Sequence, residues 1–304
     1  MHLNLLQLIF SLTVDGRVAG EYDLFDLSRR FPSAFRQVTC GRPLPCGVCP
    51  ATVDCPWFPL FAQQLSTDPE AVKRHQKPPL PFVFGIPLLL PGEKRGDDQE
   101  LRLTLVGSAI YHAADFIRGV ERYCAGDDAR SELLLTLDSV SSRGLFDERS
   151  PVRMTKGREL SGELQLLTAE DIAGKSMSDD GQVALTFLTP FQQFREGRLL
   201  RTLDVSSFLR GVIRRVSSLA AAYGDAELEA DFRWLAELSH GIEAAHNGIL
   251  FTEYAGANRG GMQGRSTLTG NLAPFLPYLF LGEYLHAGKG ASWGFGRYEL
   301  TIDN

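Results

Sequence analysis

A glycine-rich stretch near the end of the sequence carries residues suited to holding a phosphate chain. Residues 255–298 contain ten of the thirty glycines and a local formal charge of +3. The charged residues are Arg259, Arg265, Lys289 and Arg297, against Glu283. Glycine lets a backbone approach phosphates closely, lysine and arginine add charge, and aromatic rings stack on bases. The order of residues matches neither a P-loop nor a dinucleotide-binding fingerprint. The stretch therefore indicates a nucleic-acid contact or, alternatively, a tight turn that packs beneath a sheet.

Two of the six histidines lie where they could transfer protons. His286 begins the glycine-rich loop, 286–297, three residues before Lys289, and His112 follows Tyr111 near the start of an expected helix. Imidazole exchanges protons near neutral pH, and a lysine beside it can hold a phosphate. The alternatives are a histidine that fixes the loop, for His286, and a helix-surface histidine, for His112.

A second basic segment lies in the middle of the second half. Residues 195–215 hold six arginines against Glu196 and Asp204, which gives +4 in 21 residues of an acidic protein. Arg210 and Arg214 are four residues apart and share one face of an expected helix. This face predicts a surface that follows RNA phosphates without reading sequence, or alternatively an ordinary solvated helix face.

Four cysteines gather within 16 residues of a Pro-rich loop, 40–60. They are Cys40, Cys46, Cys49 and Cys55. Four thiolates satisfy tetrahedral zinc, and the C-x2-C pair is a usual zinc knuckle, although no second such pair is present. An iron–sulfur cluster needs the same ligands, and free thiols are the remaining alternative.

Composition limits the class of protein. The chain has 304 residues, 44% of them hydrophobic, and a formal charge of -6. This charge argues against a uniformly basic nucleic-acid coat but permits a local basic groove. There is no run of about 18 apolar residues, so we expect a cytosolic protein without a membrane partner or structural disulfides.

The hydrophobic pattern predicts two domains of the same type, 1–150 and 151–304. In the first, strands are expected at 2–14, 100–106 and 132–140, a Pro-interrupted strand within 77–92, and helices at 21–39 and 109–124. In the second, strands are expected at 182–189, 248–254, 265–270 and 297–302, with helices at 205–223, 227–239 and 273–285. We expect the two middle strands, 248–254 and 265–270, to pair. Each half then has the order β–α–β–β–α–β, so the expected fold class is α+β, with two tandem ferredoxin-like domains and a Cys-rich insertion.

The end of the chain resembles a known family. Residues 281–298, LGEYLHAGKGASWGFGRY, look like the C-terminal signature of CRISPR repeat-RNA processing endoribonucleases of the RAMP superfamily. Residues 259–265 and the 272–279 segment are similar to the same C-terminal domain, and Thr189-Pro190 resembles a turn found there. The resemblance implies two RNA-recognition-like domains, binding of CRISPR repeat RNA, and cleavage without a catalytic metal.

On this hypothesis single residues take roles that we choose from their types and positions, because the catalytic position varies within the family. Cleavage would proceed by attack of a 2′-OH on the adjacent phosphate, with His286 or His112 as general acid or base, Lys289 on the phosphate and Tyr111 beside His112. The product RNA stem would stay bound. The residues expected to contact RNA are Arg259, Gln263, Arg265, Gly288, Gly290, Ser292, Trp293, Arg297, Arg210 and Arg214.

Two other functions stay open. The family often takes its catalytic histidine from the N-terminal domain, yet residues 21–39 contain none. A non-catalytic RNA-binding RAMP subunit, with other CRISPR effector subunits as partners, is therefore the main alternative. An unrelated cytosolic ferredoxin-like enzyme is the other, and it would show no salt-dependent affinity for RNA.

Overall fold

The computed structural model of the chain divides into two compact units. It describes residues 3–16, 23–40, 42, 46, 49, 55–63, 77–88, 98–126, 133–155, 159–174, 182–224, 230–245, 248–253 and 260–301. The N-terminal unit is Asn4–Leu167, and the C-terminal unit is Met1–Leu3 with Thr168–Asn304. The division therefore falls later than the boundary we expected at residue 150. The reason is that residues 149–168 form strands that add to the N-terminal sheet.

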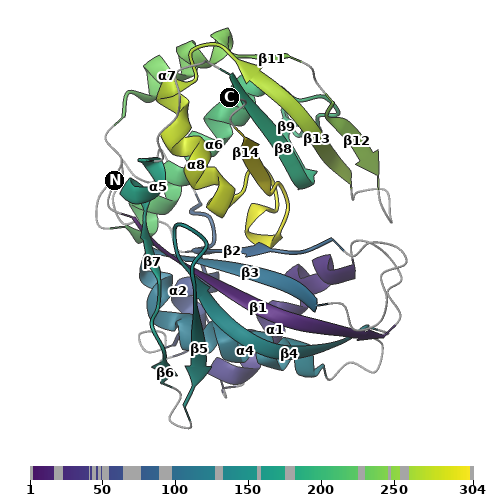
Figure 1. Ribbon diagram of the computed structural model, residues 1–304, viewed down its shortest axis with the longest axis vertical. Helices are drawn as coiled ribbons and strands as arrows, with labels where there is room; N and C mark the ends of the chain where they lie inside the picture. Colours follow the sequence, from purple (N-terminus) through teal and green to yellow (C-terminus); the bar gives the residue numbers. More distant parts are fainter. Residues whose placement is uncertain are drawn as a thin grey trace. The chain divides into compact units, whose positions relative to one another are not determined.

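The N-terminal unit is an antiparallel sheet whose central strand order is β2-β3-β1-β4. Its strands are β1 (Asn4–Gly16), β2 (Phe82–Gly85), β3 (Asp98–Val106), β4 (Leu133–Arg143), β5 (Arg149–Met154), β6 (Leu160–Ser161) and β7 (Leu166–Thr168). Strands β5 and β6 continue the sheet beyond β4, and β7 pairs with β1. This is the strand order of a ferredoxin-like fold (Figure 1). Strand β5 lies in a stretch where we expected no strand.

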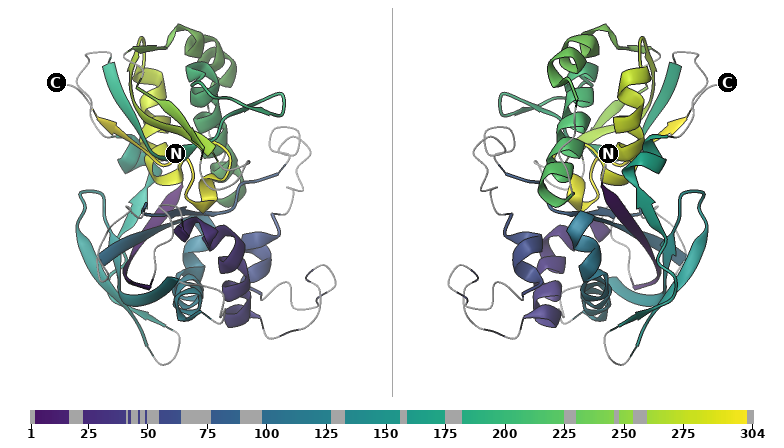
Figure 2. Two further views of the ribbon diagram at one scale, coloured as in Figure 1. Left: turned by 90° about the vertical axis from the view of Figure 1, so that its right-hand side faces the viewer. Right: turned by 90° about the vertical axis from the view of Figure 1, so that its left-hand side faces the viewer.

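Helices cover one face of this sheet (Figure 2). They are η1 (Asp23–Asp26), α1 (Leu27–Thr39), α2 (Trp57–Phe61), η3 (Gly107–His112) and α4 (Ala113–Ala125). Aromatic rings fill the layer between helices and sheet, with Phe31 of α1 4.8 Å from Phe84 and Phe35 5.0 Å from Phe116 between ring centroids. Gly119 of α4 faces these rings, and a Cβ there would lie 3.1 Å from both Phe31 and Phe35. The two helices therefore pack closely because α4 has no side chain at this point.

The C-terminal unit repeats the architecture with the order β11-β13-β8-β14. Its strands are β8 (Gln182–Phe191), β9 (Phe194–Arg195), β10 (Arg198–Leu199), β11 (Glu243–Ala245), β12 (Leu250–Glu253), β13 (Gly260–Thr269) and β14 (Tyr298–Thr301). Its helices are α5 (Ala169–Ala173), α6 (Val205–Tyr223), α7 (Phe232–Leu238), η4 (Ser239–Gly241), η5 (Ala273–Phe275), α8 (Leu276–Leu285) and η6 (Ala291–Trp293). Both units confirm the predicted α+β class with two ferredoxin-like folds.

One predicted strand pairing is wrong. Strand β12 pairs with Gly260–Gln263, whereas residues 267–269 pair with β11. The register of β13 against β8 shifts between Met262 and Gly264, and Gly264 has a φ of +117°, which is open mainly to glycine. The other edge of β13 pairs with two short strands, β12 and β11, one after the other.

Helix α6 shows why its sequence predicted it well. Its apolar stripe is buried, with Phe208, Val212, Val216 and Leu219 each at most 2% exposed. The helix begins at Asp204, whose carboxylate accepts the N–H of Ser207 at 3.0 Å. That hydrogen bond is the main reason why the pKa of Asp204 is lowered.

Candidate functional site

The glycine-rich loop is hydrogen-bonded to the end of strand β8. It leaves α8 at His286 and returns at Arg297, just before β14. The N–H of Lys289 donates to the carbonyl of Gln192 at 3.0 Å, and that of Gly296 to Pro190 at 2.9 Å. These bonds fix the loop to the two residues on either side of the end of β8. A segment about 100 residues earlier in the sequence therefore sets the shape of the loop.

Thr189 is the buried anchor of the loop. Its side chain is 1% exposed, and its hydroxyl donates to the carbonyl of Gly294 at 2.7 Å. The same oxygen accepts the N–H of Arg297 at 2.8 Å. Both ends of the turn 294–297 are thus held by one hydroxyl, which gives the Thr189-Pro190 pair a structural role.

The glycines of the loop are required by its backbone. Gly288 has φ of +76°, and a Cβ there would lie 2.4 Å from the carbonyl oxygen of Gln192. Gly296 has φ of +62°, and a Cβ would lie 1.9 Å from the carbonyl oxygen of Ala287. Gly290, with φ of +79°, is packed against Phe295. These three glycines support the interpretation of the loop as a tight turn. The turn carries Lys289 between Gly288 and Gly290.

Arg215 supports the loop from helix α6. Its Nε donates to the carbonyl of Leu285 at 2.7 Å, and its Nη2 donates to Ser292 Oγ at 3.2 Å. Burial lowers the pKa of the Arg215 guanidinium to about 10, which leaves it charged near neutral pH. A cation at the last carbonyls of α8 is favoured by the helix dipole. Ser292, predicted to contact RNA, is instead a buried partner of Arg215.

The exposed charge lies beside the loop, on the hairpin β9–β10. Lys289 is exposed, and its Nζ lies 4.7 Å from the centroid of the Phe194 ring. Arg195 and Arg198 are exposed on the two strands of this hairpin, although Arg195 also lies 3.8 Å from Asp204. We call Phe194, Arg195, Arg198 and Lys289 the basic hairpin surface. It joins the two basic segments of the sequence through a cation–π contact.

The other predicted RNA contacts are spread over the C-terminal unit. Arg265 and Arg214 are exposed, and Arg210 bonds to Ser207 of its own helix. Gln263 donates to the carbonyl of Leu188 at 3.2 Å, and Arg297 pairs with Glu299 at 3.3 Å. Trp293 is half-buried, and Arg259 lies outside the described residues.

His286 is buried, with 4% of its surface exposed. It ends helix α8 with φ of +57°, a value that side chains rarely adopt, and its N–H donates to Gly282 at 2.7 Å. Burial keeps the ring away from solvent and from any RNA phosphate on the surface. The geometry therefore favours the loop-fixing alternative for His286 over proton transfer.

Tyr111 and His112 lie at the other candidate position, in the N-terminal unit. Tyr111 is 89% exposed at the end of η3. His112 is part-exposed, and its Nδ1 lies 3.5 Å from the Oδ2 of Asp115, whose other oxygen is 3.6 Å from Arg118. A carboxylate facing Nδ1 orients the ring and leaves Nε2 for a substrate. The structure does not bring this pair and Lys289 into one unit.

The cysteine cluster shows no metal site. Cys40, Cys46, Cys49 and Cys55 are part-buried free thiols. Within the part of the chain that the structure describes, no three His, Cys, Asp or Glu side chains gather as metal ligands do. The expected zinc, or iron–sulfur cluster, therefore has no support from the geometry.

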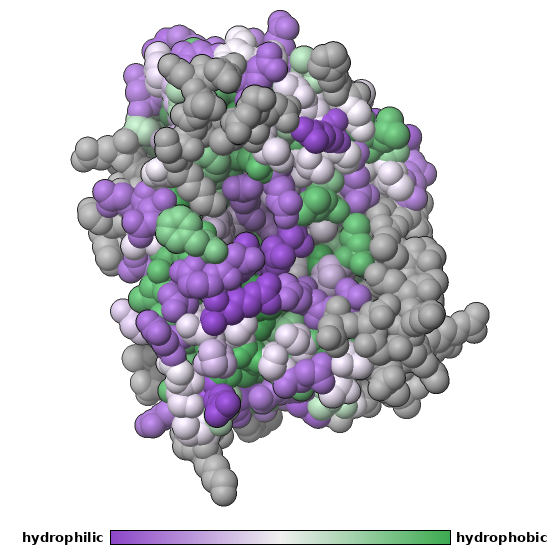
Figure 3. Space-filling model, in the orientation of Figure 1, coloured by the Kyte–Doolittle hydropathy of each residue, from purple (hydrophilic) through white to green (hydrophobic). Residues whose placement is uncertain are grey.

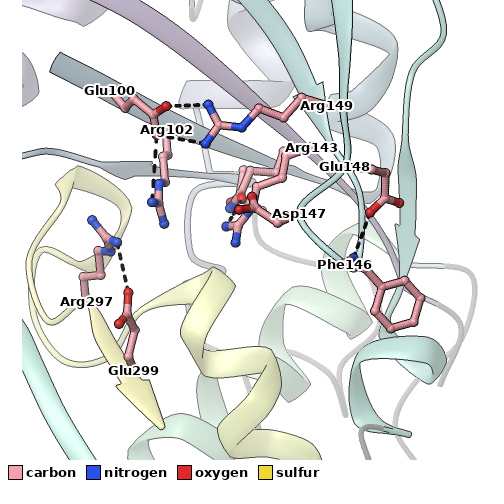
Figure 4. Close-up of polar contacts among 11 residues, drawn as sticks. Glu100, Arg102, Arg143, Phe146, Asp147, Glu148, Arg149, Arg297 and Glu299 are labelled. Atoms are coloured by element: carbon pink, nitrogen blue, oxygen red, sulfur yellow. Dashed lines mark hydrogen bonds and ion pairs between the residues drawn. The ribbon is translucent and has the colours of Figure 1, made fainter. Parts of the chain in front are cut away.

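A polar network on the N-terminal sheet, in which Gln7 and Thr104 are buried, was missed by the sequence analysis. Arg143 Nη1 donates to Gln7 at 2.9 Å, and Gln7 donates to Thr104 at 3.1 Å. Arg149 holds both oxygens of Glu100, and the hydrogen bond from Arg149 is the main cause of the lowered pKa of Glu100. Figure 4 shows Arg143, Arg149 and Glu100, and Figure 3 shows hydrophilic residues gathered across the middle of the face that it presents. The alternating pattern of β3 could have revealed them.

The tip of the hairpin β4–β5 was missed as well. It exposes Phe146, an aromatic ring that is 88% accessible. Figure 4 shows this ring pointing away from the ion pair of Arg143 and Asp147. No period in the sequence marks a single aromatic residue in a turn, so pattern analysis gave no signal for it.

The comparisons with known proteins agree with this architecture. The family model described as CRISPR-associated endoribonuclease Cas6 matches residues 185–298, and a second model, described as an N-terminal domain, matches residues 29–165. A Cas6 product complex has a TM-score of 0.58 at 15% identity, over 98% of this chain and 100% of that one. Thermus thermophilus Cas6 has a TM-score of 0.56 at 16% identity, over 99% and 100% of the two chains.

A partial Cas6-RT-Cas1–Cas2 complex is also similar in fold, with a TM-score of 0.56 at 14% identity. The similarity covers 99% of this chain and 46% of that one. No curated protein matches the chain. Among the described residues, no helix is both long and apolar enough to span a bilayer.

Proposed function

We propose that this chain is a CRISPR repeat-RNA processing protein of the RAMP type, and that it cuts precursor CRISPR RNA within each repeat without a catalytic metal. The observation that carries the proposal is the basic hairpin surface. Its exposed Lys289 lies over the ring of Phe194, and the exposed Arg195 and Arg198 lie on the same hairpin, inside the segment that matches the Cas6 model. Such a surface binds phosphates through charge, and an exposed aromatic ring can also stack on a base.

The basic hairpin surface would hold the stem of the repeat. Arg195, Arg198 and Lys289 project from a two-strand hairpin and from a loop fixed to the same strand, so their spacing is set by the fold. The exposed Arg214 on α6 offers one more cation on this unit. Contacts of this kind persist after cleavage because they involve only the stem, so the processed RNA would stay bound.

The reaction is a transfer within the RNA. The 2′-oxygen forms a bond to the adjacent phosphorus, the bond from phosphorus to the 5′-oxygen breaks, and the products are a 2′,3′-cyclic phosphate and a 5′-OH. The 2′-OH must lose a proton and the 5′-oxygen must gain one. Among the described candidates, His112 fits best because Asp115 orients its ring and Nε2 is left for RNA. The hydroxyl of Tyr111 lies beside it as a second donor.

The proposal is tested with labelled cognate repeat RNA in excess EDTA. A single cut in EDTA, abolished by a 2′-deoxy nucleotide at the cut, is the expected result. His112→Ala should remove cleavage and spare binding, whereas His286→Ala should act through stability. His240→Ala is the matched control, because His240 is an exposed histidine that we place outside the site. Cleavage that needs a divalent ion, or that survives the 2′-deoxy substitution, would refute the mechanism.

Binding is tested by salt dependence. Lys289→Ala and Arg198→Ala should each weaken RNA binding and flatten the slope of log affinity against log salt by about one contact. Arg233→Ala is the control, since Arg233 is 91% exposed on α7 and pairs with Glu237. An equal effect of all three variants would show that the charge of the hairpin has no special role.

One observation favours the second candidate function, a non-catalytic RNA-binding subunit. Helix α1 carries no histidine, and His286 is buried. Tight binding of repeat RNA without any cleavage would establish this reading. Partner subunits of a CRISPR complex stay a prediction in either case.

A further inference from the structure

The turn between β4 and β5 holds an aromatic ring in solvent by a set of specific bonds. The N–H of Gly144 donates to the carbonyl of Glu148 at 2.9 Å, and the N–H of Phe146 donates to the carboxylate of Glu148 at 2.9 Å. Arg143 Nε donates to Asp147 at 2.5 Å, and Asp147 has φ of +69°. The backbone of the turn is therefore closed on both sides, and the Phe146 ring projects from it (Figure 4).

The strand register places this turn at the same end of the sheet as Tyr111. Leu5 of β1 pairs with Val106, the last residue of β3, and Gln7 pairs with Arg143, the last residue of β4. The η3 turn with Tyr111 and the turn with Phe146 therefore both leave the sheet beside the start of β1. These two rings are the most exposed large hydrophobic side chains of the described residues, at 89% and 88%.

The charges around Phe146 identify the chemistry of a ligand. Two arginines, Arg143 and Arg149, are balanced by Asp147 and Glu148, so the turn has no net charge. Such a turn attracts a phosphate weakly, whereas an exposed ring can stack on a nucleobase.

We propose that Phe146 stacks on an unpaired base of the repeat RNA, next to the nucleotides held by Tyr111 and His112. The proposal rests on the proposed function, because it takes RNA as the ligand. It assigns a nucleotide site to the β4–β5 turn, separate from the basic hairpin surface. That surface holds phosphates, while the Phe146 site holds a base.

The experiment compares two RNAs that carry a 2′-deoxy nucleotide at the cut, so that binding is measured without cleavage. One is the repeat stem-loop with unpaired nucleotides on both sides, and the other is the stem-loop alone. Phe146→Ala should weaken binding of the first RNA by about 5- to 100-fold, the range for one base–aromatic stack, and leave the second unchanged. Phe146→Tyr should bind like the original protein. Leu166→Ala, an exposed apolar residue of the same unit, is the control.

A second readout separates stacking from charge. The loss in Phe146→Ala should be the same at low and high salt, whereas the loss in Lys289→Ala should shrink as salt rises. A 2-aminopurine placed among the unpaired nucleotides should be quenched by the original protein and not by Phe146→Ala. Cleavage may fail while these results hold, which would overturn the nuclease function but keep the base site.

Three results would overturn the inference. Equal weakening of both RNAs would assign Phe146 a general structural effect. Unchanged affinity for both RNAs would exclude a base and leave a protein surface as the use of the ring. Failure of the original protein to bind either RNA would remove both the inference and the proposed function.

Discussion

Replacing Thr189 with valine tests whether one buried hydroxyl holds the glycine-rich loop. Valine has nearly the same shape as threonine, so the substitution removes hydrogen bonds and leaves little empty space. The carbonyl of Gly294, at 2.7 Å, loses its donor, and the N–H of Arg297, at 2.8 Å, loses this acceptor. Water cannot readily replace the hydroxyl, because Thr189 is only 1% exposed.

The size of the effect follows from these two groups. Leaving a buried polar group unsatisfied costs about 1–3 kcal/mol, so two such groups lower the free energy of unfolding by about 2–6 kcal/mol. For a domain of this size that corresponds to a decrease in Tm of about 6–18 °C. Because the loop carries Lys289, RNA affinity should decrease as well.

The assay is thermal and urea unfolding of Thr189→Val beside Thr186→Val. Thr186 lies on the same strand, is part-exposed, and makes no side-chain hydrogen bond within the described part of the chain. We expect the control to melt like the original protein. If both variants melt within about 1 °C of it, a shift that matches well under 1 kcal/mol, the reasoning about Thr189 is wrong.

Three more predictions concern stability and reactivity. Gly211→Ala should raise the free energy of unfolding, measured in a melt, by about 0.5–1 kcal/mol, because a Cβ there meets no atom within 4 Å. Gly282→Ala should lower the free energy of unfolding, because its Cβ would lie 1.9 Å from a tyrosine oxygen. Glu100 has a lowered pKa, so its ion pair with Arg149 stabilises the fold above the ordinary pKa of glutamate and is lost as pH falls through the lowered value. Urea unfolding should therefore show Glu100→Gln less stable than the original protein at pH 7, with the difference shrinking as the pH falls through the lowered pKa of Glu100. Burial raises the pKa of the Cys124 thiol to about 12, so a thiol reagent at pH 8 should modify Cys124 only after unfolding. The measurement uses a variant in which the other four cysteines are replaced by serine.

Sequence patterns predicted the fold more successfully than the site. Helix α6 was placed at 205–223, its observed bounds, because its apolar stripe is a local signal. The pairing of β12 was mispredicted, since the order in which β12 and β11 pair with β13 follows from contacts between strands and not from a period. A hydrophobic pattern shows which face of an element is buried, but it does not show which edge a short strand will join.

The site shows the same limit at the level of side chains. The glycine-rich loop was found from its composition, but its sequence does not show that Ser292 and His286 point inward and Lys289 outward. That outcome depends on Arg215 and Thr189, which lie 77 and 105 residues away from their partners in the loop. The arginine of α6 that supports the loop could not be told apart from Arg214 beside it.

The distance between Thr189 and Gly294 also has a consequence for the order of folding. Helix α6 and the hairpin β9–β10 close through local contacts, but the loop needs β14 beside β8, a contact across more than 100 residues. Long-range contacts of this kind close slowly and late. A growing chain would therefore complete its basic hairpin well before Lys289 reaches it. Competence to hold RNA would then arise in one late step, when β14 joins the sheet, and not gradually during synthesis.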